Sequence, residues 1–307
     1  MQKRLDGHAA GTRRVRVVTG GVLLVLLAVL LVACTTVPLT GRSQLMLISE
    51  ETAIAASEPA YFQLLSEPAA EGRLDNDAAL RARVEHISGR IIAQAIRLRP
   101  ETADWKWSIH VIDEPETINA WAMAGGRMAI YSGLIHKLEP TDDELAQVLG
   151  HEVAHALARH SAEQMSVALA TNVAINVWAV RDHPSTGSLA GVSLAAALAI
   201  QLPNSRGAES EADRIGIELA ARAGYDPAAA VTLWQKMSTA AKSGVPAFLS
   251  THPSHNTRIE ELRALVPTMR PLYEAASAPP VYEFPPAASG LPGVAGATGA
   301  TRKSDYR

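Results

Sequence analysis

One stretch, residues 141–160, constrains this chain more than any other: TDDELAQVLGHEVAHALARH. A single helix is predicted here, because Thr141 can cap it while Glu144 reaches back, which is a capping box. His151 and His155 are then about one turn apart on one face, so both imidazoles can reach one metal ion. Glu152 would flank that ion and could take a proton from a water molecule bound to it. The alternative is a chance HExxH match on a surface helix.

A second helix is expected to complete the metal site. A catalytic zinc ion usually takes three protein ligands and a water molecule, so HExxH leaves one ligand to be found. One solution is a histidine six residues after His155 with a glycine midway, but those positions hold Ser161 and Ala158. The other common solution is a glutamate from a later helix. Residues 205–222, SRGAESEADRIGIELAAR, offer several acidic candidates.

Helical geometry separates these acidic residues. At about 100° per residue, four alternating charges fall on one stripe, which is typical of a solvent-exposed face: Glu211, Arg214, Glu218 and Arg222. Glu209 and Asp213 lie on the opposite side. Burying an unpaired carboxylate is costly, and a metal ion with its histidines would compensate it. We therefore expect Glu209 to be the third ligand and Asp213 to orient a histidine or to transfer a proton. The alternative is a cluster of acids favoured by the helix dipole.

The N-terminus has the layout of an export signal. A basic start is followed by an apolar run over residues 17–33, VVTGGVLLVLLAVLLVA. The run is slightly shorter than the roughly 20 residues that span a bilayer, so an uncleaved membrane anchor is the alternative. Its end, LVAC, resembles a bacterial lipobox, which implies that residues 1–33 are a lipoprotein signal peptide and that the lone Cys34 is lipidated. By the same resemblance, Thr35 favours the outer membrane.

The rest of the chain is expected to supply a scaffold. Residues 34–48 are interpreted as a tether, 49–272 as one domain and 273–307, rich in Ala, Pro and Gly, as a disordered tail. Residues 49–66 and 77–98 predict amphipathic helices. Residues 164–202 predict either a buried helical hairpin or a partly exposed apolar flap near a cleft or a membrane. A net charge of −3 with scattered Lys and Arg argues against nucleic acid as a partner.

Two glycines mark a hairpin before the HExxH helix. Residues 105–112 predict a strand, and residues 119–131, NAWAMAGGRMAIY, predict two short strands around Gly125 and Gly126. A strand beside a metal helix can bind an extended peptide by edge addition, which would involve Asn119, Ala120, Gly125 and Gly126. An ordinary sheet strand is an equally good interpretation.

Taken together, the motifs resemble the CaaX-prenyl-protease-like family of zinc endopeptidases, on HEVAH, SRGAESEAD some fifty residues later, and GYDP. TGRSQLMLISE and NAWAMAGGRMAIYSGL are similar to its bacterial periplasmic lipoprotein branch, which includes proteases tied to outer-membrane protein assembly. The match covers about residues 40–270. It implies that Glu209 binds zinc and that Asp213 has a supporting or proton-donating role. It also implies that His252 can occupy the fourth zinc position as a switch, with Arg258 near the cleft. Without this resemblance, we would interpret His252 as a loop histidine.

These observations predict an α+β, mainly helical, zincin-like (gluzincin) metallopeptidase domain with a small sheet beside the HExxH helix. One Zn²⁺ is expected on His151, His155 and Glu209, with Glu152 as general base for peptide hydrolysis. The resemblance implies unfolded or misassembled envelope proteins as substrates, at the periplasmic side of the outer membrane or, alternatively, the inner membrane. Two other hypotheses are a chaperone-like protein with zinc latched by His252 and a structural lipoprotein with a vestigial metal. No array of membrane spans and no helical-repeat domain is expected.

Overall fold

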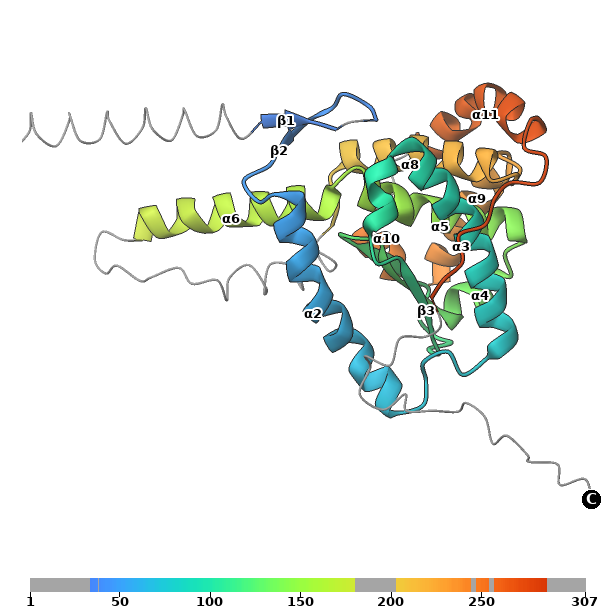
Figure 1. Cartoon of the computed structure of the whole chain (residues 1–307), viewed down its shortest axis with the longest axis horizontal. Coiled ribbons are helices and arrows are strands. Elements are labelled where there is room, and N and C mark those ends of the chain that lie inside the picture. The colour runs from blue at the N-terminus through green and yellow to red at the C-terminus, as the bar shows by residue number, and fades with distance from the viewer. Residues whose placement is uncertain (1–33, 38, 180–202, 244–246, 254–256, 286–307) are drawn as a thin grey trace, which may run out of the picture.

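A computed structural model of the 307-residue chain describes residues 34–37, 39–179, 203–243, 247–253 and 257–285. The apolar run over 17–33 and the segment 180–202 lie outside these ranges, so the signal-peptide prediction and half of the hairpin-or-flap prediction are not tested. Within the described residues, no helix is both long enough and apolar enough to cross a membrane. The domain is mainly helical, as predicted, and it contains two small sheets where one was expected (Figure 1).

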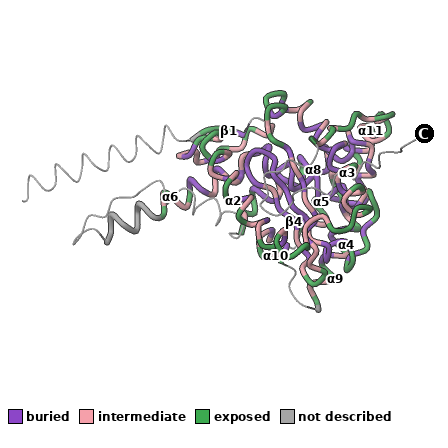
Figure 2. The backbone as a smooth tube through the Cα atoms, turned by 60° about the horizontal axis from the view of Figure 1, so that its bottom comes forward, coloured by how far each residue is buried: buried purple, intermediate pink, exposed green. Residues whose placement is uncertain are grey.

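A buried helix, α5 (Asp142–Leu157), lies at the centre of the domain. Thr141 caps it: its Oγ1 accepts a hydrogen bond from the backbone N–H of Glu144, and Glu144 Oε2 accepts one from the N–H of Thr141, at 3.2 and 3.0 Å. The predicted capping box is therefore present. Every residue of α5 from Glu144 onward is buried. Figure 2 shows buried backbone concentrated around α5, α8 (Arg206–Arg222) and β4 (Ala120–Met123).

The main sheet has the strand order β3-β5-β4 and lies beside α5. β3 (Ser108–Ile112) runs parallel to β5 (Arg127–Tyr131), and β4 is antiparallel to β5. The predicted hairpin is confirmed, with Gly125 and Gly126 at positive φ in its turn. Among the described residues β4 pairs only with β5, so its other edge is open.

The remaining helices surround this centre. α2 and α3 precede the sheet. The bounds of α2 differ from the predicted ones by at most four residues, and those of α3 by at most one. α4 links β5 to α5. Two short 3-10 segments, η2 and η3, complete the connections. The bounds are α2 (Glu50–Ala70), α3 (Ala78–Leu98), η2 (Pro100–Asp104), α4 (Ser132–Leu138), α6 (His160–Ala179), α9 (Ala229–Ala240), η3 (Ala241–Ser243), α10 (Ala247–Thr251) and α11 (Arg258–Glu274).

The segment expected to be a tether is folded over residues 34–37 and 39–45. β1 (Cys34–Thr36) and β2 (Ser43–Leu45) form an antiparallel pair, here called the N-terminal hairpin. Val37 is buried, and Gln44 donates from Nε2 to the carbonyl of Ala158 at 2.6 Å. Sequence periodicity did not indicate this strand pair, because its buried positions are too few, and the tether role stays a prediction.

Two further segments differ from what the sequence predicts: the start of the apolar segment 164–202 and the start of the tail 273–307. Val167 and Leu169 on α6 are exposed, and in Figure 1 this helix extends away from the domain, so its described part is not a buried hairpin. At the other end, Tyr282 and Phe284 pack against the core, and the N–H of Tyr282 donates to the carbonyl of Gly89 at 2.9 Å. The tail predicted as disordered is thus packed as far as residue 285. Residues 286–307 are not described.

Candidate metal centre

Four side chains from three parts of the chain converge inside the domain. His151 and His155 come from α5, Glu209 from the first turn of α8, and His252 directly follows α10. Each offers one ligand atom, and these atoms all lie within 4.8 Å of one another. All four residues are buried, and Glu209 is completely shielded from solvent. The two histidines and the glutamate expected to share one ion are therefore brought together.

The spacing within the cluster is that of groups arranged around a common centre. His151 Nε2 is 3.0 Å from His155 Nε2 and 3.2 Å from His252 Nδ1. The Glu209 Oε1 atom lies 3.3 Å from His155 Nε2 and 3.0 Å from His252 Nδ1. Ring nitrogens aimed at one another in a buried space repel through their lone pairs unless a proton or a cation lies between them. Three imidazoles and one carboxylate are a donor set that suits zinc.

Close packing of α5 on α8 places Glu209 against the histidines. Gly150 and Gly216 meet where the helices cross, and a Cβ on Gly216 would lie 2.8 Å from the backbone nitrogen of His151. A Cβ on Gly150 would lie 2.7 Å from the carbonyl oxygen of Gly216. Only glycine at both positions allows this approach, because any side chain would separate the two backbones.

Asp213 and Arg258 support the cluster from α8 and α11. Asp213 Oδ1 lies 3.0 Å from His151 Nδ1, on the side of the ring away from the cluster. Arg258 is fully buried and donates from Nη2 to Asp213 Oδ1 at 2.6 Å and from Nη1 to Glu209 Oε2 at 2.9 Å. Its guanidinium carbon also lies 3.4 Å from the ring centre of Trp234. Glu209 and Asp213 thus face the site, as the helix geometry predicted.

The local charges bias the protonation of these groups. Burial alone would lower the pKa of His151, but the Glu209 and Asp213 carboxylates raise it to about 9. Burial opposes ionisation of Glu209 too, yet the charges of His151 and His252 hold the pKa of Glu209 well below its usual range. Burial lowers the pKa of His155. The cluster therefore contains an ionised carboxylate that needs a positive charge beside it.

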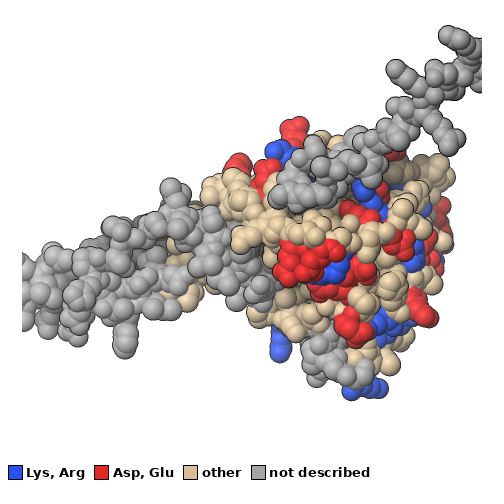
Figure 3. Space-filling view, turned by 90° about the horizontal axis from the view of Figure 1, so that it is seen from below, with Lys and Arg blue, Asp and Glu red and all other residues tan. Residues whose placement is uncertain are grey.

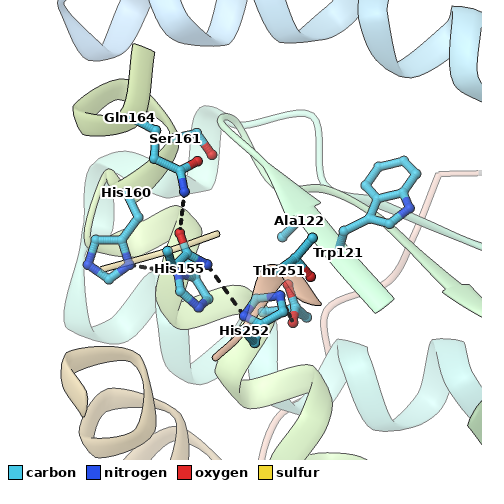
Figure 4. A pocket seen from close by; sticks show the side chains of 10 residues that line it. Trp121, Ala122, His155, His160, Ser161, Gln164, Thr251 and His252 are labelled. Carbon is cyan, nitrogen blue, oxygen red and sulfur yellow. Dashed lines mark hydrogen bonds and ion pairs between the residues drawn. The ribbon is translucent and has the colours of Figure 1, made fainter. Parts of the chain in front are cut away.

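Glu152 lines a small cavity next to the cluster. Figure 4 shows His155, His160 and His252 around this cavity. The cavity measures about 30 Å³, enough for at least one water molecule. Burial raises the pKa of Glu152, and its Oε1 has no hydrogen-bond partner among the described residues. The lining residues come from β4, α5, α6 and the segments near α10: Trp121, Ala122, Glu152, His155, His160, Ser161, Gln164, Asn204, Thr251 and His252.

The strand residues chosen from the sequence do not line this cavity. Asn119 precedes β4, and Ala120 is its first residue. Gly125 and Gly126 form the hairpin turn, where they pack near Ile54 and Trp107 respectively. The β4 residues at the cavity are instead Trp121 and Ala122. The hairpin was located correctly, but the sequence could not show which part of β4 passes the metal helix.

One expected exposed acid is buried. Glu211 was placed on the solvent-exposed stripe of α8, yet it is only 6 % exposed. His160 Nε2 lies 2.9 Å from Glu211 Oε2, and Arg42 Nε donates to the same oxygen at 2.6 Å. Thr40 also hydrogen-bonds Glu211. The prediction was wrong because the N-terminal hairpin, distant in sequence, covers this side of α8. Arg214 is exposed, and Glu218 pairs with Arg222 one turn later, as predicted.

His160 was missed as well, because the helix predicted over residues 141–160 is present but ends before His160. α5 ends at Leu157, and Arg159 adopts a positive φ of 63° before α6 begins at His160. This break turns His160 back, so that its Nδ1 lies 2.7 Å from His155 Nδ1. No glycine marks the break, so helical periodicity alone gives no signal for it.

Comparison with known proteins agrees with this geometry. Residues 78–266 match the model of peptidase family M48. The bovine mitochondrial metalloendopeptidase OMA1 is 34% identical over 260 residues, which are 80% of this chain and 48% of that protein. The fission-yeast (Schizosaccharomyces pombe) mitochondrial metalloendopeptidase OMA1 is 34% identical over 233 residues, 75% of this chain and 66% of that protein. The beta-barrel assembly-enhancing protease of Yersinia pestis is 31% identical over 211 residues, 66% and 39% of the two chains.

These relatives include both mitochondrial and bacterial proteins, so the bacterial lipoprotein branch stays a prediction. The chain spans about half the length of the bovine relative. The family match covers both metal helices, the sheet and His252. Because this match spans more than half of the chain and includes the buried cluster suited to zinc, the chain belongs to peptidase family M48.

Proposed function

We propose that this protein is a zinc-dependent endopeptidase that hydrolyses peptide bonds in unfolded or misassembled proteins of the cell envelope. The observation that carries the proposal is the buried cluster of His151, His155, Glu209 and His252 beside the buried carboxylate of Glu152. Oε1 of Glu152 has no hydrogen-bond partner among the described residues and lies 3.5 Å from His252 Nε2. We assign His151, His155 and Glu209 as the residues that hold one zinc ion. Membership in family M48 supports the reaction class.

When bound, zinc supplies Lewis acidity to a water molecule and to the peptide carbonyl. Glu152 is the general base in this proposal: it accepts the proton of the attacking water and can return it to the leaving amine. Its raised pKa, caused by burial, makes its carboxylate a stronger base than an exposed glutamate. The cavity beside Glu152 gives the water a place to bind.

Asp213 is assigned to orientation rather than to proton donation. Its Oδ1 is close to both His151 Nδ1 and Arg258 Nη2, so it can fix the ring of His151 with Nε2 turned toward the cluster. Arg258 holds Asp213 and Glu209 together and compensates part of their negative charge.

An extended substrate can be accommodated along β4. The open edge of this strand offers backbone hydrogen bonds that require little sequence preference, which suits unfolded clients. Trp121 and Ala122 bring this edge to the cavity that contains Glu152. The beta-barrel assembly-enhancing protease among the relatives supports envelope proteins as the client class. The lipobox-like end of the apolar run supports attachment through Cys34 to the periplasmic side of the outer membrane, with the inner membrane as the alternative.

The position of His252 favours a second candidate function. Its Nδ1 lies 3.0 Å from Glu209 Oε1 and 3.2 Å from His151 Nε2, so it can occupy the fourth position that water needs. A protein latched in this way would hold clients along β4 without cleaving them. An active protease requires His252 to move aside when substrate binds.

The substitution Glu152→Gln separates these functions. We expect it to keep the zinc content and client binding of the wild type, because Glu152 is not assigned as a ligand. Cleavage of casein should fall by about 10²- to 10⁴-fold, since a general base is lost. Glu116→Gln, which changes an exposed glutamate, is the matched control. Equal cleavage by pure Glu152→Gln protein would refute the mechanism. Zinc-loaded wild type that binds but does not cleave clients would support the latched form.

A further inference from the structure

Both nitrogens of the His155 ring have close partners, on opposite sides of the ring. Nε2 faces the cluster, 3.0 Å from His151 Nε2 and 3.3 Å from Glu209 Oε1. Nδ1 faces away from it and lies 2.7 Å from His160 Nδ1. His160 in turn directs its Nε2 to Glu211 Oε2 at 2.9 Å, and both residues are buried. A line of three side chains therefore runs from the cluster to the far side of α8.

We propose that His160 and Glu211 are positioning residues of the metal centre: they fix the tautomer and the orientation of His155 and connect it to the N-terminal hairpin. This inference rests on the metal site of the proposed function. It assigns these two residues a role that the HExxH and Glu209 motif does not include.

The metal at one end of this line and the Glu211 carboxylate at the other determine which nitrogen of each histidine ring carries the proton. A histidine that gives its Nε2 lone pair to a metal carries its proton on Nδ1. His155 Nδ1–H then donates to His160 Nδ1, which must be unprotonated. A neutral His160 therefore carries its proton on Nε2 and donates it to the Glu211 carboxylate. Each donor meets one acceptor, so the ring of His155 is held in the tautomer that ligation needs.

Glu211 is itself fixed by the loop of the N-terminal hairpin. Arg42 donates from Nε to Glu211 Oε2 at 2.6 Å, and Thr40 hydrogen-bonds the other carboxylate oxygen. The Glu211 side chain is only 4% exposed, so these partners compensate a buried charge. Arg42 also bonds both oxygens of Glu163 on α6, at 2.9 and 2.5 Å. The hairpin is thereby joined to α6 and α8 next to the site.

The arrangement repeats on the other α5 histidine. Asp213 Oδ1 lies 3.0 Å from His151 Nδ1. The Nδ1 atom of each of the two imidazoles is therefore linked to a carboxylate from α8. For His151 the contact is direct, and for His155 it passes through His160. Three acids spaced two residues apart would then have distinct roles. Glu209 is a ligand, Asp213 supports the ligand His151, and Glu211 supports the ligand His155 through His160.

The test compares zinc affinity in the full chain, by competition with a chelator. Residues that hydrogen-bond a metal-ligating histidine typically contribute about 10- to 100-fold to metal affinity. We therefore expect His160→Leu to lower the zinc affinity by about 10- to 100-fold. His160→Gln keeps an oxygen that can accept from His155 Nδ1–H, so it should recover part of the affinity. The absorption spectrum of the Co²⁺-loaded protein should change in His160→Leu, because the His155 ring is no longer oriented.

Two matched controls remove similar interactions elsewhere. Glu163→Gln removes the other carboxylate partner of Arg42 and leaves the His160–Glu211 contact intact. His110→Leu removes a different histidine–carboxylate pair, in which His110 Nδ1 lies 2.5 Å from Asp75 Oδ2. Zinc affinity and the Co²⁺ spectrum should stay at wild-type values in both. Folding of each variant is monitored by circular dichroism.

The wild type offers a second measurement that does not depend on a variant. Nitrogen-15 NMR of the zinc-loaded protein should place the His160 proton on Nε2 and leave Nδ1 unprotonated. A proton on His160 Nδ1 would overturn the proposal, as would folded His160→Leu that binds zinc within about twofold of wild type. If His160→Leu does not fold, the NMR result decides. A wild type that binds no zinc would instead refute the proposed function itself.

Discussion

Arg258 shows how much the site depends on a single residue. It is fully buried and lies between Glu209 and Asp213, at 2.9 and 2.6 Å from their carboxylate oxygens. Removing one partner from a buried ionic group leaves the remaining charges uncompensated, and this costs more than the pair contributes in net stability.

We therefore expect Arg258→Met to lower the unfolding free energy of the metal-free protein by about 3–5 kcal/mol. Urea denaturation after chelation measures this value, and zinc should reduce the loss because the ion compensates Glu209. Arg270→Met on the same helix is the control: its partner Asp226 is partly exposed, so the change should stay within about 1 kcal/mol. An Arg258→Met variant as stable as this control would contradict the assigned role.

Single residues were predicted well where they share a helix face and poorly where a distant segment decides their environment. His151, His155, Glu209 and Asp213 face one site because helical spacing fixes their direction. Glu211 is on the same helix, but its burial depends on Thr40 and Arg42, about 170 residues earlier. Nothing in the periodicity of α8 encodes that contact.

At the scale of elements, the contact between α5 and α8 positions the site. The Gly150–Gly216 crossing allows the two backbones to approach closely, which brings the first turn of α8 to the histidines. The α5 start was predictable because its capping box is local in sequence. The α5 end was not, because the positive φ at Arg159 depends on packing rather than on a glycine.

Gly216→Ala should separate the two helices. A Cβ there meets backbone atoms of Gly150 and His151 at 2.8–2.9 Å, which cannot move aside as a side chain would. We expect a loss of about 1–3 kcal/mol in the unfolding free energy, together with weaker zinc binding.

Gly207→Ala on the same helix is the matched control for this prediction. The nearest atom to its added Cβ is Ser205 Oγ at 3.9 Å, so stability should change by no more than about 1 kcal/mol, in the stabilising direction. Calorimetry and chelator competition on both variants measure the effect. Equal behaviour of the two alanine variants would mean that the helix crossing does not position the site.

At the scale of the whole molecule, the N-terminal hairpin connects the start of the described chain to the metal centre. β1 begins at Cys34, the predicted lipidation site, and the loop after it carries Thr40 and Arg42. On the face shown in Figure 3, acidic and basic side chains are interspersed. The mainly helical class followed from the sequence, whereas the hairpin did not, because it has few apolar positions.

The proposed lipid attachment at Cys34 makes a prediction for the whole molecule in its cell. Cys34→Ala should release the protein from the membrane fraction or block processing of residues 1–33, because the acceptor thiol is absent. Cell fractionation and intact-protein mass spectrometry measure both outcomes, with Thr35→Ala as control. An unchanged mass and unchanged membrane attachment in Cys34→Ala would contradict lipidation.

The zinc content of the purified full-length chain tests the central claim most directly. We expect about one zinc ion per wild-type chain, measured by elemental analysis, because in the described part of the chain one cluster of four donor atoms is assembled from α5, α8 and the residue after α10. Glu209→Gln should lower this content strongly, while Glu218→Gln on the exposed side of α8 should not. A folded wild type that takes up no zinc, or a Glu209→Gln variant that retains it fully, would contradict the account.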